Sequence, residues 1–214
     1  MRLSENTKSI LENLSTINPS IILRPGNEIR VGTPGLTLFC TARVDETFER
    51  QVGIYNLKKF LGVLSLLDGE PELVFGDGSI SITNGKQAIS YVLSDQSLIK
   101  ASPDHDPGVP TPITSFELAA SELATTLKAS SVLGLPTIAF GGDGTHIRIV
   151  ARDSSNTSKD AYTSIICESS HVFDTPLPRT SFKMMNLDYT VHIHNDYAKF
   201  DHPSITYWLP RQIV

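Results

Sequence analysis

Apolar residues recur at helical spacing twice in the first half of the chain. The segment 4–18 has its apolar residues on one side of a helix, Ser4 can cap its start, and Pro19 ends it. A second apolar arc begins at Leu57 and stops at the turn pair Asp68-Gly69. The core-facing residues are Ile10, Leu11, Leu14 and Ile17 in the first segment and Leu57, Phe60, Leu61, Val63, Leu64 and Leu67 in the second. The pattern therefore predicts two amphipathic helices.

Short runs rich in β-branched and aromatic residues occupy the rest of the first half. Glycine and proline turns bound them, and the segments GDGS (76–79) and NGK (84–86) are strong hairpin signals. The predicted strands are residues 21–24, 28–32, 36–43, 48–55, 72–75, 79–83 and 87–93. This mixture of helices and hairpin-connected strands favours an α+β domain with antiparallel sheets.

The composition changes between residues 94 and 114. The segment SDQSLIKASPDHDPGVPTPIT carries four prolines and three aspartates and has little periodicity, which is typical of a linker. We therefore expect a first domain at residues 1–94, a connecting linker at 95–112 and a second domain at 113–214.

The second half repeats the order of the first: helix, strands, helix, three strands. A helix is predicted at 119–133, with Leu123 and Leu127 inward and Ala124 and Ser131 beside them, and a short helix at 178–185. The predicted strands are residues 113–118, 137–140, 146–152, 161–168, 171–173, 188–194, 197–201 and 205–209. SILENLSTINPSIILRPGNEIRV also resembles SELATTLKASSVLGLPTIAFGGDGTHIRIV, since each passes from a helix through a glycine turn to Ile-Arg-Val or Ile-Arg-Ile. The chain is predicted to be an internal duplication.

Charge is distributed unevenly along this acidic chain, whose formal net charge is -5 and whose pI is about 5.6. Each predicted helix carries a cation on its non-core face, and no acid lies between Asn56 and Leu67. These cations are Lys8, Lys58, Lys59, Lys128, Arg179 and Lys183. They can be ordinary solvated side chains, and Lys8 can pair with Glu12. Gathered on one surface, they would instead hold a polyanion through its phosphates without reading its sequence.

Sites of chemistry are not apparent in the sequence. Cys40 and Cys167 are expected to be buried reduced thiols, and no signal peptide or membrane-spanning run is found. His192-x-His194 near Asp196 can be a metal pair, but strand alternation explains the spacing equally. The GGDGTH segment lacks the Lys-Ser/Thr of a phosphate loop, and the Asp104-His105-Asp106 run lies in the linker. We expect no enzymatic activity and no cofactor.

The segment IYNLKKFLGVLSLL and the N-terminal MRLSENTKSILENLSTIN closely resemble the T-even-type bacteriophage DNA polymerase sliding clamps. ITYWLPRQIV resembles the end of the eukaryotic clamp PCNA. The resemblance implies a ring homotrimer, with two similar domains per subunit, two helices per domain lining a central hole and antiparallel sheets outside. The six cations named above would face sequence-independent double-stranded DNA, in the cytoplasm of an infected bacterial host. The implied partners are the C-terminal peptide of the replicative DNA polymerase, a clamp-loader ATPase and late-transcription factors.

The resemblance also implies a peptide pocket beneath the linker. Its residues would be Phe39, Val109, Pro110, Ile113, Trp208, Leu209 and Pro210. Trp208 can alternatively pack in the second-domain core. The other reading of the chain is a β-rich structural virion protein, which would form a large shell assembly instead of a discrete trimer.

Overall fold

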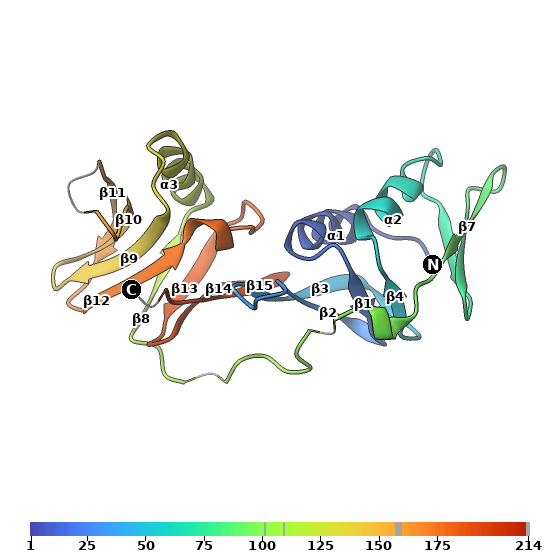
Figure 1. Ribbon diagram of the computed structural model, residues 1–214, viewed down its shortest axis with the longest axis horizontal. Coiled ribbons are helices and arrows are strands. Elements are labelled where there is room, and N and C mark those ends of the chain that lie inside the picture. The colour runs from blue at the N-terminus through green and yellow to red at the C-terminus, as the bar shows by residue number, and fades with distance from the viewer. Residues whose placement is uncertain (101, 109, 157–159, 213–214) are drawn as a thin grey trace. The chain divides into compact units, whose positions relative to one another are not determined.

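The structure, a computed structural model, describes residues 1–100, 102–108, 110–156 and 160–212. The chain divides into two compact units (Figure 1). Unit 1 comprises Met1–Leu36 and Cys40–Asp106, and unit 2 comprises Thr37–Phe39 and Pro107–Val214. The division after Asp106 falls inside the predicted linker at 95–112, whose own limits stay a prediction.

Two helices pack together in unit 1, α1 (Glu5–Ile17) and α2 (Leu57–Leu64) (Figure 1). The Ser4 hydroxyl caps α1 by accepting a hydrogen bond from the Thr7 N–H at 3.1 Å, as expected of this residue type. The helix ends before Pro19, which cannot continue the hydrogen-bond ladder. The predicted apolar arcs of both helices are the faces that contribute to the core.

The strands of the first half of the chain include two short antiparallel sheets. The strands are β1 (Ile21–Leu23), β2 (Gly26–Gly32), β3 (Phe39–Phe48), β4 (Val52–Ile54), β5 (Glu72–Phe75), β6 (Ser79–Thr83) and β7 (Ala88–Val92). Strand β1 pairs with β4, and β5, β6 and β7 form a three-stranded meander. In the turn between β6 and β7, Gly85 has a φ of 87°, a conformation that glycine adopts without strain. The NGK segment is therefore the hairpin turn that the sequence predicts.

The described residues of unit 2 contain one α-helix, α3 (Ala120–Val132), on a sheet with the strand order β11-β10-β9-β12 (Figure 1). A second row of strands runs in the order β15-β14-β13-β8. The strands are β8 (Thr114–Leu118), β9 (Thr137–Asp143), β10 (His146–Arg152), β11 (Tyr162–Glu168), β12 (Val172–Pro178), β13 (Tyr189–Ile193), β14 (Tyr197–His202) and β15 (Ile205–Pro210). Phe140 of β9 and Phe200 of β14 meet at 5.8 Å between ring centroids, so aromatic side chains fill the core between the two rows.

The helix predicted at 178–185 is absent. Strand β12 continues to Pro178, and only Arg179–Ser181 forms one 3-10 turn, η2, closed by the Phe182 N–H donating to the Arg179 carbonyl at 3.1 Å. Thr180 and Ser181 are weak helix formers, and the segment lacks the run of buried apolar side chains that supports α2, a helix of the same length. The prediction of two helices per domain is therefore correct for unit 1 and wrong for unit 2.

No helix within the described ranges is both long and apolar enough to cross a membrane.

Candidate nucleic-acid interface

Helix α2 presents two neighbouring lysines to solvent. The Asn56 side chain caps the helix by accepting a hydrogen bond from the Lys59 N–H at 2.8 Å, while Leu57 and Phe60 are buried. Lys58 and Lys59 are exposed, and neither makes an ion pair with a described residue. The core contacts of α2 thus fix the direction of an uncompensated positive face.

Helix α1 differs from α2 in the balance of its charges. The Lys8 ammonium lies 2.7 Å from a Glu5 carboxylate oxygen, so its charge is compensated within the helix, by Glu5 and not by the Glu12 that the sequence suggested. Glu5 and Glu12 are both exposed. The outer face of α1 is therefore a weaker phosphate-binding candidate than that of α2.

The remaining predicted cations belong to unit 2. Lys128 is exposed on α3, Arg179 is half-buried in the 3-10 turn η2, and Lys183 is exposed just after it. Lys128 makes no ion pair within the described part of the chain, so it keeps a free charge as Lys58 and Lys59 do.

Phe39 and Trp208 come together in unit 2, as the predicted peptide pocket requires. Their ring centroids are 5.3 Å apart with the planes tilted by 39°, and the residues are 6% and 4% exposed. Leu209, however, is fully buried and shares the core face of β15 with Tyr207. It therefore cannot contact a partner, and the prediction that it lines the pocket is wrong.

The other predicted pocket residues have different environments. Pro110 and Pro210 are exposed, Ile113 is half-buried with its N–H donating to the Ile193 carbonyl at 2.7 Å, and Val109 lies outside the described residues.

Two residues missing from the predicted pocket lie on the same sheet face as Trp208, Tyr197 on β14 and His194 just after β13. The Tyr197 hydroxyl donates to the Gly108 carbonyl of the linker at 2.8 Å, and the Tyr197 ring stacks on His194 with centroids 4.4 Å apart. Burial lowers the pKa of His194, and the nearby charges of His192 and Lys199 lower it further. Strand alternation predicts from the sequence that His192 and His194 lie on one face. The ring that stacks on His194 belongs to the next strand, β14, so this contact could be identified only from the fold.

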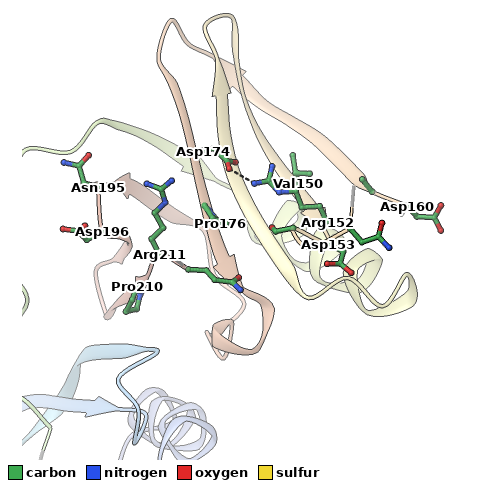
Figure 2. Close-up of a pocket in the computed structure, with 14 residues that line it drawn as sticks. Val150, Arg152, Asp153, Asp160, Asp174, Pro176, Asn195, Asp196, Pro210 and Arg211 are labelled. Atoms are coloured by element: carbon green, nitrogen blue, oxygen red, sulfur yellow. Dashed lines mark hydrogen bonds and ion pairs between the residues drawn. The ribbon is translucent and has the colours of Figure 1, made fainter. Parts of the chain in front are cut away.

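A cleft of about 950 Å³ lies elsewhere on unit 2, next to the C-terminal segment (Figure 2). On one side Arg152 of β10 pairs with Asp174 of β12 at 2.5 Å. On the other, the Arg211 N–H donates to the Asp196 carbonyl at 2.7 Å, beside Pro210. Both signs of charge line the cleft, and the sequence did not indicate it because its walls come from four separate segments.

The residues that suggested metal binding have other contacts. His192 Nδ1 shares a hydrogen bond of 2.7 Å with the Ser115 hydroxyl, and Asp104 pairs with Arg24 at 2.5 Å. Asp106 accepts from the Thr41 hydroxyl at 2.7 Å. The acidic run of the linker thus ties that segment to unit 1, and the described residues contain no cluster of three metal-ligating side chains.

The chain is similar in sequence to phage proteins, although no family model matches it. It is 32% identical to the sliding clamp of Enterobacteria phage T4 over 143 residues, which are 65% of this chain and 61% of that protein. The sliding clamp of Vibrio phage KVP40 is 25% identical over 202 residues, 91% of this chain and 90% of that one.

Solved structures share the architecture along the whole chain. The proliferating cellular nuclear antigen (PCNA) of Entamoeba histolytica superposes with a TM-score of 0.72 at 14% identity, covering 99% of this chain and 98% of the other. PCNA of A. fulgidus, solved with the C-terminal region of FEN-1 bound, gives a TM-score of 0.73 at 15% identity over 97% and 95% of the two chains. The fold is that of a DNA sliding clamp.

The clamp fold and the phage relatives confirm the resemblance drawn from the N-terminal segments and from IYNLKKFLGVLSLL. They also confirm the predicted α+β fold class. The clamp fold explains why the chain has two units with antiparallel sheets and few helices.

Proposed function

We propose that the chain is a subunit of a sliding clamp that encircles duplex DNA and tethers the replicative DNA polymerase to it. The observation that carries this function is a clamp fold along 99% of the chain whose α2 presents two uncompensated lysines. Lysines on a smooth helix contact phosphates interchangeably, so every position along the DNA has a similar energy and the ring can slide. Such a protein performs no chemistry and needs no cofactor.

Two open sheet edges support a closed ring. Strand β7 borders the meander of unit 1, and β11 borders the four-stranded sheet of unit 2. The opposite edges are occupied, because Met1 exchanges hydrogen bonds with Leu73 of β5 and the Gln212 N–H donates to Pro176 of β12 at 2.8 Å. An open edge is a template for another strand. Strand β7 of one subunit beside β11 of the next would give a head-to-tail contact, which makes a ring where the rotation between copies closes. Three copies are the number that the resemblance to the phage clamps implies.

The proposed partners follow from a closed ring. A ring cannot pass onto DNA unless it opens, so a clamp-loader ATPase is required. The C-terminal peptide of the polymerase would enter beside Phe39 and Trp208, and late-transcription factors would use the same face. A tethered polymerase then reaches an effective concentration at the primer end in the ~mM range. This work would take place inside the infected host cell.

A topological experiment tests the proposal. The trimer is loaded onto a nicked circular plasmid with the loader ATPase, and retention is measured by gel filtration before and after cutting the circle. A clamp stays on the circle and leaves the linear DNA, whereas a protein bound by ordinary contacts stays on both. Equal retention on circular and linear DNA, or a large shell assembly in native mass measurements, would contradict the clamp and favour a structural virion protein.

A further inference from the structure

The acidic half of the linker, residues 102–106, lies along unit 1 and is held there by two arginines. Arg24, which follows β1, lies 2.5 Å from an Asp104 carboxylate oxygen. Arg30 of β2 donates to the Asp104 carbonyl at 2.6 Å and lies 3.4 Å from an Asp106 carboxylate oxygen. All of these residues belong to unit 1, so the contacts are internal to that unit. We call residues 102–106 the linker strap.

Two further hydrogen bonds fasten the first and last residues of the linker strap. The Ser102 hydroxyl accepts from the Gly32 N–H at 3.0 Å, and the Thr41 hydroxyl donates to an Asp106 carboxylate oxygen at 2.7 Å. Ser102 thereby pairs a backbone donor of β2, which is an outer strand of its sheet. The linker strap is therefore attached to unit 1 at both of its ends.

The contacts that hold the linker strap are mainly ionic and lie near solvent. The Asp104 side chain is 82% exposed and the Arg24 side chain is 30% exposed. An exposed ion pair contributes little on its own, and ordering a backbone costs free energy at every residue. Pro103 and Pro107 reduce that cost because their φ angles are already fixed. The attached and released states therefore lie close in free energy, and salt, which screens exposed pairs, favours release.

Arg30 makes the largest share of these contacts. Its guanidinium bonds the Asp104 carbonyl and an Asp106 carboxylate oxygen, and it also lies 2.6 Å from a Glu28 carboxylate oxygen. The planar fork of an arginine can bond several oxygens at once, and the ammonium of a lysine does not reproduce that geometry. Loss of the Arg30 guanidinium should therefore release the linker strap more than loss of any other single contact.

We propose that Arg30, together with Arg24, is a positioning residue for partner binding, because the two arginines order the linker before a partner segment arrives. The inference rests on the proposed function, and it adds regulation of the proposed peptide site by residues of unit 1. Beyond the linker strap the chain continues to Pro110 and Ile113, which the resemblance to the clamps assigns to that site. A partner that binds beside an ordered linker does not have to order it, so the attached linker strap raises the affinity.

The test measures binding of a fluorescein-labelled peptide of about the last twelve residues of the DNA polymerase encoded by the same virus. Arg30→Gln removes the ionic contacts and is expected to weaken binding roughly threefold to tenfold at low salt, the equivalent of one or two exposed ion pairs. Arg30→Lys keeps the charge without the fork and should recover only part of the affinity. Arg50→Gln is the matched control, because it removes an exposed pair with Asp77 in the same unit and should bind as wild type.

Two readouts separate positioning of the linker from a general loss of folding. Arg24→Glu and Asp104→Arg should each weaken binding alone, and the double variant should restore it because the pair forms again with the charges exchanged. Salt should weaken binding by wild type more than binding by Arg30→Gln, so the two affinities should converge at high salt.

Proteolysis measures release of the linker strap directly. Endoproteinase Asp-N cleaves before aspartate, and Asp104 and Asp106 both lie in the linker strap. Cleavage there should be faster in Arg30→Gln than in wild type at low salt, and the ratio of the two rates should approach one as salt is added.

Three results would overturn the inference and leave the clamp function standing. They are peptide binding by Arg30→Gln equal to that of wild type, a charge-exchanged double variant that binds no better than either single variant, and equal Asp-N cleavage of Arg30→Gln and wild type. A wild-type protein that binds no peptide but is retained on circular DNA would also overturn the inference alone. Loss of both peptide binding and retention would remove the proposed function too.

Discussion

At the scale of single residues, burial decides which reactive groups are available. Cys40 is fully buried on β3, as the sequence predicts, and desolvation raises the pKa of its thiol far above the ordinary range despite an opposing backbone hydrogen bond. Cys167 was also expected to be buried, but it is half-exposed on the edge strand β11. The local sequence of both residues is apolar, so the difference in their exposure comes only from their position in a sheet.

The two thiols are therefore expected to react at different rates. Iodoacetamide at pH 8 should modify Cys167 in the native protein, while Cys40 should react only as fast as the unit unfolds, because its thiolate is not accessible. Mass spectrometry of peptides over time measures both sites in one sample, and a sample in urea provides the fully reactive reference. Modification of Cys40 at the rate of Cys167 would show that β3 is not part of a stable core.

The lysines of α1 and α2 also differ at this scale. Lys58→Ala with Lys59→Ala removes two uncompensated charges per subunit and should reduce the slope of log K for DNA against log salt by about 0.9 for each phosphate that these lysines neutralise. Stability should be unaffected because both side chains are exposed. Primer extension across a salt series measures the resulting decrease in processivity.

Lys8→Ala is the internal control for that experiment. Its charge is already compensated by Glu5 at 2.7 Å, so its removal should change the salt slope much less. If the double variant of Lys58 and Lys59 gave products as long as wild type at every salt concentration, the DNA contact would have to be assigned to Lys128 or to Arg179 and Lys183 instead.

At the scale of elements, one aromatic side chain joins the two strand rows of unit 2. Phe200 of β14 lies 5.8 Å from Phe140 of β9 and 6.0 Å from Phe182, measured between ring centroids. It also meets Tyr189 of β13 edge-on at 6.1 Å. Strands from both rows thus depend on the same side chain.

Truncating this side chain should weaken the whole of unit 2. Phe200→Ala removes a fully buried ring and leaves a cavity, which typically lowers the free energy of unfolding by about 3–5 kcal/mol. Val132→Ala, at the end of α3 where the side chain is 78% exposed, should change it by less than about 0.5 kcal/mol. Urea denaturation followed by circular dichroism compares the two. A Phe200→Ala destabilisation no larger than that of the control would contradict the packing described.

At the scale of the whole molecule, assembly depends on edges and not on the core. Val92 of β7 is 74% exposed and Ile165 of β11 is 54% exposed, although both are apolar. Apolar side chains on open edges favour association, and here they lie on β7 and β11, which are outer strands of their sheets.

Substitution of lysine for the exposed apolar residue on β7 or on β11 should therefore separate the subunits without unfolding them. Val92→Lys and Ile165→Lys are each expected to give a monomer in sedimentation equilibrium with a Tm close to wild type, because neither side chain belongs to the core. Both should still bind the polymerase peptide, since neither Val92 nor Ile165 belongs to the proposed peptide site at Phe39 and Trp208. Trimers that persist in both variants would place the subunit contact elsewhere.

The sequence by itself determined most elements because their signals are local. Strands β5, β6 and β10 begin and end where predicted. Glycine turns bound them, and apolar and polar residues alternate along each strand between the turns. The apolar arc of α2 also fixed which way Lys58 and Lys59 point.

Only the tertiary structure decided the features that depend on distant residues. On α3 the buried positions include Thr126 and Ser130, whose hydroxyls bond backbone carbonyls, while Ala124 and Ser131 face solvent contrary to prediction. Leu209 and Trp208 are adjacent apolar residues, yet strand alternation sends one into the core and the other to the opposite face. The stacking of Tyr197 on His194 follows from the pairing of β13 with β14. Their positions in the sequence carry no sign of it, because a cross-strand contact is fixed by register and not by local composition.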